Sequence, residues 1–178
     1  MVPDVKKELL SDALGWAKVV LFAVAVAILL NTFVIVNAVV PTGSMQGTIR
    51  ENDRVIAFRL SYMFSQPQRF DIIVFRRPDS AYLYVKRIIG MPGETVNMQD
   101  GRVYINDAVT PLRDGFVHGE ITGNYGPFHI PEGYYFVLGD YRTNSGDSRW
   151  WATHVSAESI QGRVIFRYFP GFKNLTNT

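Results

Sequence analysis

"VVLFAVAVAILLNTFVIVNAVV", residues 19–40, is an uninterrupted apolar stretch that is followed at once by "PTGSM", residues 41–45. The stretch contains no charged residue, and its polar side chains are Asn31, Thr32 and Asn37. A helix needs about 20 consecutive apolar residues to cross the hydrocarbon layer of a membrane. The sequence therefore predicts one transmembrane helix near the N-terminus, and Ser44 directly beyond it.

Two other structures could contain such a stretch. A buried core helix is disfavoured, because a helix that is apolar on all sides needs a larger protein around it. A cleavable signal peptide is compatible with Lys6, Lys7 and Lys18 before the stretch and with "VNA", which ends at Ala38. The stretch exceeds the usual apolar core of about 7–15 residues in a signal peptide, which favours a retained anchor.

The distribution of basic residues predicts the orientation of this anchor. Lys6, Lys7 and Lys18 precede it, and the next basic residue is Arg50. Positive charge is retained on the cytoplasmic side of a membrane. We therefore expect a single-pass protein of the plasma (cytoplasmic) membrane, with a cytoplasmic N-terminus and the remaining chain on the outer face.

Composition excludes several classes of function. The net charge of +2 and the dispersed Lys and Arg residues do not indicate a nucleic-acid groove, so no nucleic-acid partner is expected. The chain has no cysteine, which rules out disulfides and thiolate chemistry. His118, His129 and His154 lie far apart, without the spacing of a zinc site. We expect a structural or surface role for each histidine, and neither a metal nor another cofactor.

After residue 40 the sequence changes to short β-like runs separated by turns. Asp100-Gly101 between two of these runs is a typical hairpin signal. No long helical period is present, so we expect a mainly β fold class: an antiparallel β-sheet domain preceded by one N-terminal transmembrane helix. The expected organisation is a short cytoplasmic segment (1–18), the transmembrane anchor (19–40), an extracytoplasmic β-rich domain (41–170) and a polar tail (171–178).

A reactive serine needs a neighbouring base, which is usually histidine and sometimes lysine. Lys86 lies within the apolar and aromatic run "YLYVKRIIGMPGE" (82–94), and in a strand it shares one face with Tyr82, Tyr84 and Ile88. Partial burial would lower the pKa of its amine, and no carboxylate stands beside it in the sequence to oppose this. A lysine at a sheet edge with its amine in water would give the same pattern. Spacing alone leaves both possibilities open and does not link Ser44 to Lys86.

The motifs "PTGSM", "YLYVKRIIGMPGE" and "GDYRTNSGDSRWW" (139–151) occur in the order found in bacterial type I signal peptidases. These are membrane-bound Ser/Lys leader peptidases. "NDRVIAF" (52–58), "FDIIVFRRP" (70–78) and "GRVIFRYFP" (162–170) also resemble that family. The resemblance covers the chain from the anchor to about Pro170. The short chain resembles the compact members of the family, which have a single anchor.

The resemblance implies a role for each matching residue. Ser44 is expected to be the nucleophile and Lys86 the general base, with the Ser44 backbone N–H and the Thr42 hydroxyl as the oxyanion hole. Ser145 would hydrogen-bond the lysine amine. Paired charges would support the dyad, namely Asp140 with Arg87 and Asp147 with Arg149. Substrate would be bound by Val40, Pro41, Met45, Ile49, Tyr84 and Val85.

The chain also departs from the family pattern. Gly47 stands where the family commonly has proline, Phe70 where it commonly has glycine, and Ala152 where glycine is frequent. "GDYRTNS" replaces the usual "GDNRDNS". These departures leave every expected catalytic atom in place and affect the local loop geometry.

The function that the resemblance implies is removal of N-terminal signal peptides from exported precursors by a serine endopeptidase, with small residues preferred before the scissile bond. Precursor proteins that carry signal peptides and membrane lipid are the expected partners. Met63, Phe64, Trp150 and Trp151 could contact lipid or fill the core. Two other functions are a soluble, self-cleaving protease of the repressor type, which the anchor disfavours, and an inactive anchored β domain that binds secreted chains or a partner.

Overall fold

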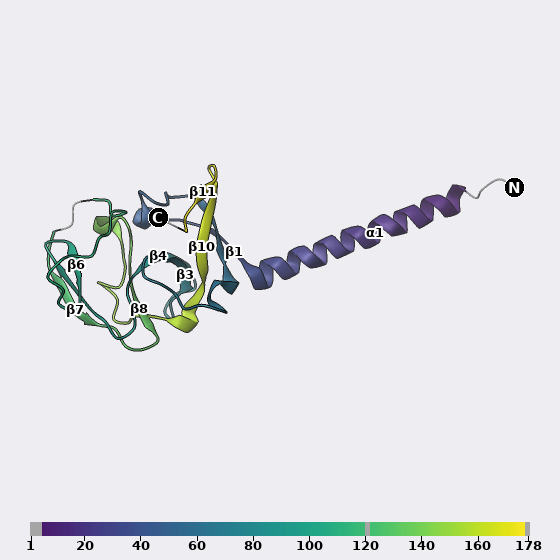
Figure 1. Cartoon of the computed structure of the whole chain (residues 1–178). Coiled ribbons are helices and arrows are strands. Elements are labelled where there is room, and N and C mark those ends of the chain that lie inside the picture. The colour runs from purple at the N-terminus through teal and green to yellow at the C-terminus, as the bar shows by residue number, and fades with distance from the viewer. Residues whose placement is uncertain (1–4, 120–121, 177–178) are drawn as a thin grey trace.

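The computed structural model describes residues 5–119 and 122–176. Helix α1 (Val5–Leu29) continues into a π-helical turn, η1 (Leu30–Val34), and the chain then enters strand β1 (Ile35–Val39). Figure 1 shows α1 extending away from a compact β domain. The segment Asp12–Val34 is long and apolar enough to span a membrane, and the rest of the protein does not cover it. This helix fits a membrane anchor.

The expected anchor range of residues 19–40 differs from the structure at its C-terminal end. Residues 35–39 form β1, in which the side chains of Val36 and Ala38 are buried while those of Asn37 and Val39 are exposed. This alternation is the period of a half-buried strand. The last part of the apolar stretch therefore belongs to the β domain, as its edge strand.

The main sheet contains eight antiparallel strands. Seven of them follow the order β1-β2-β10-β3-β4-β8-β9, and β11 pairs with β10. The strands besides β1 are β2 (Arg54–Phe58), β3 (Ile72–Arg76), β4 (Leu83–Gly90), β8 (Tyr134–Leu138), β9 (Val155–Ser156), β10 (Ile160–Phe169) and β11 (Lys173–Asn174).

A second sheet has the order β6-β5-β7 and is also antiparallel. It consists of β5 (Thr95–Gln99), β6 (Arg102–Ile105) and β7 (Tyr125–His129), and lies on the side of the domain away from α1 (Figure 1). Asp100 and Gly101 form the tight turn between β5 and β6, both with positive φ (47° and 76°). The predicted hairpin and the predicted fold class are confirmed.

Short 3₁₀ turns connect the strands at several points. They are η2 (Gly43–Met45), η3 (Arg59–Tyr62), η4 (Arg142–Asn144) and η5 (Ala157–Ser159). Turns η2 and η4 contact each other, and η2 also contacts β4. Residues 43–45, 83–90 and 142–144 are thus brought to one place.

The core is formed by three clusters of buried apolar side chains. One lies between β1, β2, β3 and β10 and includes Val55 and Val164. Another lies under the three-stranded sheet and includes Val96 and Phe136. The last contains Phe75 and its neighbours on β4 and β8. Strand β4 contributes residues to all three clusters, and its central residues are therefore buried on both faces.

The expected polar tail, residues 171–178, is largely part of the domain. Residues 173–174 form β11, and the backbone N–H of Leu175 donates a hydrogen bond to Ile165 O at 2.9 Å. The side chain of Leu175 is buried in the first core cluster. Its burial explains why the segment folds back despite its polar composition. Residues 177 and 178 lie outside the described residues.

Candidate active site

Ser44 is fixed by the short turn η2, which follows β1. The backbone N–H of Gln46 donates to Gly43 O at 2.9 Å and closes this turn. The carbonyl oxygen of Ser44 accepts a hydrogen bond from Tyr141 N at 3.0 Å. Two segments far apart in the sequence thus hold the Ser44 backbone, and only 5% of the residue remains exposed.

Lys86 lies in the middle of β4, with its amine beside this serine. Its Nζ is 2.5 Å from Ser44 Oγ, which is within hydrogen-bonding distance. Lys86 is 4% exposed. The face that it was predicted to share is apolar in the structure, because Ile88 and Tyr84 pack in the cluster around Phe75. Tyr82, at the outer end of this face, is largely exposed.

Burial lowers the pKa of the Lys86 amine from 10.5 to about 8. Desolvation is the main cause, because it disfavours the charged amine. The charges of Asp147 and Asp140 act in the opposite direction, while Arg149 lowers the pKa of Lys86 further. The sequence placed no carboxylate beside Lys86, but the fold brings these two near it. A substantial fraction of the amine is neutral at mildly alkaline pH.

The hydroxyl of Thr42 lies beside the serine. Thr42 Oγ1 donates a hydrogen bond to Ser44 Oγ at 3.3 Å, and the residue is exposed. A donor in this position can turn toward a substrate carbonyl that approaches Ser44. The oxyanion role of Thr42 stays a prediction.

The ion pair between Arg87 and Asp140 is completely enclosed. Arg87 Nε donates to Asp140 Oδ1 at 2.8 Å and Arg87 Nη2 donates to Oδ2 at 2.7 Å. Thr48 Oγ1 donates to the same Oδ2 at 2.5 Å, and the ring of Phe116 covers the guanidinium at 4.0 Å. A buried charge pair needs such additional partners to offset the cost of its desolvation. Thr48 and Phe116 were missed, since neither lies in a motif that singles it out.

A second buried ion pair supports the loop after β8. Arg149 donates from Nε and Nη2 to the two carboxylate oxygens of Asp147, at 2.8 and 2.9 Å. Arg149 Nη2 also donates to Arg142 O at 2.7 Å, and Asp147 Oδ2 accepts from Gly139 N at 3.1 Å. Arg142, which the sequence analysis did not single out, pairs with Asp114 at 2.9 Å. Both predicted charge pairs are therefore formed.

Ser145 differs from its expected arrangement. Its side chain is buried, but its Oγ has no hydrogen-bond partner among the described residues. The expected bond to the Lys86 amine is absent there, and the hydrogen bond that the amine makes is to Ser44 Oγ. Ser145 nevertheless lies close to Ser44: a Cβ built on Gly139 would meet both Ser145 Oγ and Ser44 O.

A groove of about 530 Å³ runs over these groups. Its walls are residues 40–42 and 44 on one side and residues 82–86 on the other, with Asn144 and Gly146 nearby. Of the predicted substrate-binding residues, Val40, Pro41, Tyr84 and Val85 line it. Met45 and Ile49 do not: both are fully buried in the first core cluster.

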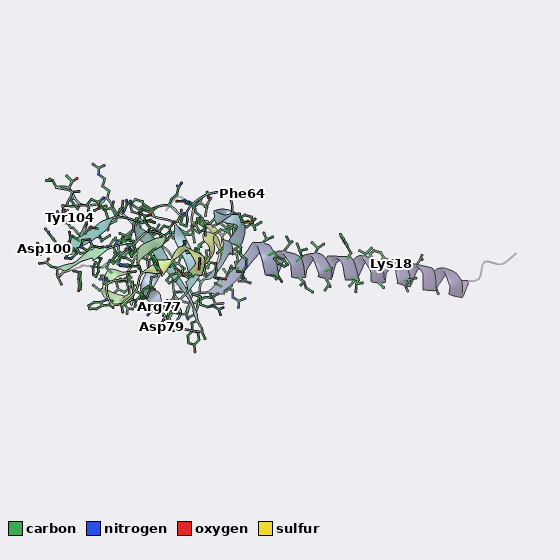
Figure 2. The ribbon with its side chains drawn as sticks, turned by 90° about the horizontal axis from the view of Figure 1, so that it is seen from below. Lys18, Phe64, Arg77, Asp79, Asp100 and Tyr104 are labelled. Carbon is green, nitrogen blue, oxygen red and sulfur yellow. The ribbon has the colours of Figure 1, made fainter. Side chains whose placement is uncertain are left out.

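The four residues considered for lipid contact divide into two groups. Met63, Phe64 and Trp150 are 63%, 90% and 62% exposed. Trp151 is half-buried, and its ring meets Phe75 and Tyr84 edge-on. Figure 2 shows Phe64 next to the junction of the helix and the domain.

Two departures from the family pattern have a structural explanation. Phe70 has a φ of +75°, a conformation that glycine adopts without strain, and its N–H donates to Ile88 O at 2.8 Å. Gly47 has a φ of +102°, which proline cannot adopt, and the ring of His118 occupies the place that a Cβ would need. The turn after the serine is therefore built around glycine in this chain.

Comparison with known proteins shows that this chain is a peptidase. Its apolar helix α1 fits a membrane anchor. The chain belongs to the signal peptidase family, peptidase S26, whose family model matches residues 13–169.

Several relatives have substantial identity. A signal peptidase I of Leptolyngbya laminosa is 37% identical over 161 residues, which cover 86% of this chain and 78% of the relative. Signal peptidase I T of Bacillus subtilis is 35% identical over 165 residues, covering 88% and 86% of the two chains. A crystal structure of a signal peptidase I from Enterococcus faecalis V583 matches with a TM-score of 0.49 and 35% identity, over 56% of this chain and 97% of that chain.

Proposed function

We propose that this protein is a membrane-anchored endopeptidase that removes signal peptides from exported precursor proteins, with Ser44 as the nucleophile and Lys86 as the general base. The observation that carries the proposal is the 2.5 Å separation of Lys86 Nζ and Ser44 Oγ on the wall of a groove. Membership of the signal peptidase family and the printed names of the relatives support the substrate class.

The first chemical step needs a neutral lysine. The Lys86 amine accepts the hydroxyl proton of Ser44 as the serine oxygen attacks the scissile carbonyl carbon. The negative charge that develops on the carbonyl oxygen is stabilised by the Thr42 hydroxyl and the Ser44 backbone N–H. Such donors are worth on the order of 3 kcal/mol each in comparable sites.

Collapse of this intermediate breaks the peptide bond. The Lys86 ammonium gives its proton to the leaving amine, and an ester remains on Ser44. Lys86, again neutral, then removes a proton from water, which attacks the ester. As the ester bond breaks, the Lys86 ammonium returns this proton to Ser44 Oγ, and the new C-terminus is released. The charge pair Arg87–Asp140 joins β4 to the loop after β8, and the pair Asp147–Arg149 supports that loop.

The groove accommodates an extended substrate. A peptide lying between residues 40–42 and 83–85 would add a strand, with backbone hydrogen bonds supplying affinity. Tyr84 lines the groove beside Lys86. We expect small side chains, and alanine in particular, before the scissile bond, as membership of the signal peptidase family implies.

The proposed setting is the outer face of the cytoplasmic membrane, with the N-terminus inside. The basic residues before the anchor support this orientation. Exported precursors reach this face as they leave the membrane, which brings the end of the signal peptide to the groove.

Cleavage of a precursor by the full chain in detergent tests the proposal. N-terminal sequencing of the product should place the cut after a small residue. Ser44→Ala and Lys86→Ala should each abolish cleavage without unfolding the domain, because each removes a reacting group. Ser65→Ala, at an exposed loop serine, is the matched control and should cleave normally. Turnover at the wild-type rate by either site variant would refute the Ser/Lys assignment, and an inert wild-type protein would refute the enzymatic function.

A further inference from the structure

The groove wall that carries Tyr84 is supported from behind by aromatic rings. The ring of Tyr84 stacks on Phe75, with a centroid distance of 5.8 Å. Trp151 meets Tyr84 edge-on at 5.9 Å and Phe75 at 6.0 Å. Phe75 is fully buried and Trp151 is half-buried. The position of the Tyr84 ring therefore depends on where Trp151 lies.

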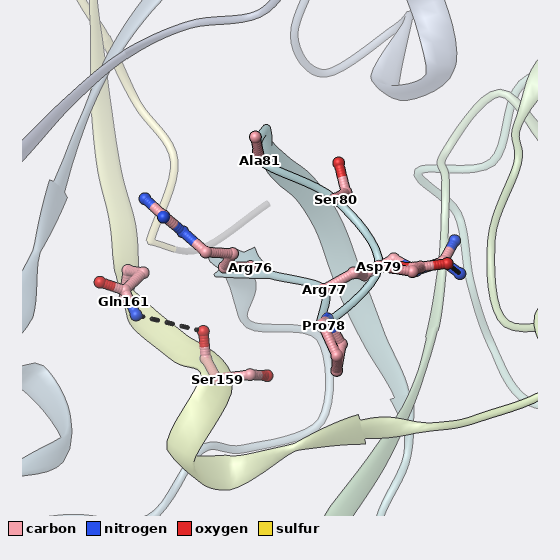
Figure 3. Close-up of a pocket in the computed structure, with 8 residues that line it drawn as sticks. All are labelled: Arg76, Arg77, Pro78, Asp79, Ser80, Ala81, Ser159 and Gln161. Carbon is pink, nitrogen blue, oxygen red and sulfur yellow. Dashed lines mark hydrogen bonds and ion pairs between the residues drawn. The ribbon is translucent and has the colours of Figure 1, made fainter.

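Arg77 covers the outer side of these rings. Its guanidinium lies 4.3 Å from the centroid of the Trp151 ring and 5.8 Å from that of Tyr84. Asp79 holds the guanidinium through an ion pair of 2.6 Å. Figure 3 shows Arg77 and Asp79 on one side of the loop between β3 and β4, while Arg76 reaches away from them. Adjacent arginines thus have different surroundings.

The same loop fixes the other end of Tyr84. The Tyr84 hydroxyl donates to Ser80 Oγ at 3.3 Å, and Ser80 N donates to Arg77 O at 3.2 Å in the turn. Ser80 Oγ also accepts from Tyr82 N at 3.1 Å. The hydroxyl and the ring of Tyr84 are therefore both attached to the segment that begins with Arg77.

Tyr84 is placed to contact substrate close to the reacting bond. It lies two residues before Lys86 on the same face of β4 and lines the same groove. Two residues of a strand span about 7 Å, so the ring faces substrate side chains within about two residues of the scissile bond. Small shifts of this ring alter the width of the groove there.

We infer that Arg77 is a specificity-determining residue that acts by positioning Tyr84. It clamps Trp151 against the Tyr84 ring and so keeps the groove narrow, which excludes larger side chains before the scissile bond. This inference rests on the proposed function. Arg77 touches neither Ser44 nor Lys86 in any described contact, so its removal leaves the dyad in place.

Kinetics with three peptides test the inference. One peptide has alanine at the last residue before the cut and at the residue two positions earlier, and each of the others has valine at one of these positions. The preference for alanine is the ratio of kcat/KM for the alanine peptide to kcat/KM for a valine peptide. In Arg77→Ala, this ratio should fall roughly 3- to 10-fold for at least one of the two valine peptides, in keeping with the loss of a cation–π contact. The rate constant kcat for the alanine peptide and the pH at which activity rises should not change.

Two variants separate positioning from loss of charge. Arg76→Ala removes the same charge one residue away, where the side chain is exposed, and should keep the full preference for alanine. Arg77→Lys retains a cation for the ring and should recover part of the preference. An unchanged preference in Arg77→Ala at both positions, or an equal fall in Arg76→Ala, would overturn the inference.

Binding distinguishes this inference from the proposed function. The three peptides, fluorescently labelled, are titrated into the Ser44→Ala chain with and without Arg77→Ala. The ratio of the dissociation constant of a valine peptide to that of the alanine peptide should fall when Arg77→Ala is added, by a factor similar to the fall of the preference in kcat/KM. If the wild-type chain cleaves nothing but the ratio still narrows, the catalytic proposal fails while the role of Arg77 stands. A constant ratio beside normal wild-type cleavage refutes the role of Arg77 alone.

Discussion

Gly139 lies directly against the backbone of Ser44. A Cβ at Gly139 would come within 2.4 Å of the Ser44 carbonyl oxygen and 2.3 Å of Ser145 Oγ, closer than real Cβ contacts. The Ser44 carbonyl also accepts the hydrogen bond from Tyr141 N. Gly139, the residue after β8, therefore supports the backbone of the nucleophile at a position where no side chain fits.

Gly139→Ala should displace the Ser44 turn. We expect kcat/KM to fall at least tenfold and the free energy of unfolding to drop by about 1–3 kcal/mol, the usual cost of overpacking. Gly115→Ala is the control, because a Cβ there meets nothing within 4 Å. Both are measured by peptide cleavage and by urea unfolding. Normal activity in Gly139→Ala would mean that the nucleophile does not depend on this contact.

Thr42→Ala should lower kcat by roughly 10- to 1,000-fold, the range for one lost oxyanion donor. Thr42→Ser keeps a hydroxyl and should retain most of the activity. The KM should change little, because the donor acts mainly on the charge of the transition state. Equal kinetics for the alanine and serine variants would exclude Thr42 from the oxyanion hole.

Activity should rise with pH around an apparent pKa of about 8, the value to which burial lowers the Lys86 amine. Only the neutral amine can accept the serine proton, so the rate is low below this pH and reaches a plateau above it. The measurement is kcat/KM against pH on a peptide without titrating groups in this range. A rise near pH 6.5 that disappears on replacing His118, His129 or His154 would instead identify a histidine base.

The same amine should make stability depend on pH. The pKa of Lys86 is about 8 when folded and 10.5 when unfolded, so between these values the unfolded chain binds more protons. Burying the charged amine costs stability fully below pH 8, and the cost disappears as pH rises to 10.5. It amounts to roughly 3 kcal/mol at 1.36 kcal/mol for each pKa unit. Lys86→Met should thus be more stable than wild type at pH 7, and urea unfolding should show the difference shrinking toward pH 10.5. A constant difference would show that the amine does not titrate in this range.

We expect the two exposed residues after η3, Met63 and Phe64, to touch lipid. Turn η3 contacts η1 at the end of the anchor, and Figure 2 shows Phe64 beside this junction. Exposed apolar side chains of this kind mark contact sites. A chain that begins at Ile35 keeps β1, and it should sediment with lipid vesicles. Met63→Ser with Phe64→Ser should weaken this binding severalfold, whereas Val109→Ser, at a 96% exposed position after β6, should not. Equal binding by both variants would contradict lipid contact through this turn.

Local pattern was sufficient to predict the β class, the helix and the hairpin at Asp100-Gly101. It could not predict where the helix ends, because residues 35–39 are as apolar as the segment before them. Pairing with β2, which is a long-range interaction, determines that they form a strand. Leu175 shows the same limit, since a single apolar residue in a polar tail carries no periodicity.

At the candidate site, the resemblance identified which residues meet, and spacing alone did not. The resemblance assigned Met45 and Ile49 to the substrate, yet both side chains are buried in the first core cluster. Thr48, Phe116 and Gly139 could not be singled out, because their importance comes from contacts with Asp140, Arg87 and Ser44 across the fold. Such contacts depend on tertiary packing and cannot be predicted from the local sequence.

Strand β1 connects the membrane segment to the nucleophile with almost no slack. Residues 35–43 separate η1 from the serine, and five of them are held in register with β2. At about 3.3 Å for each residue, β1 alone rises about 17 Å. In a membrane-anchored peptidase, this strand fixes the distance between the serine and the end of the membrane segment. On the proposed function, we therefore expect a precursor to be selected by the distance between its cleavage point and the place where its own chain leaves the lipid, so that a small residue at another distance stays uncut.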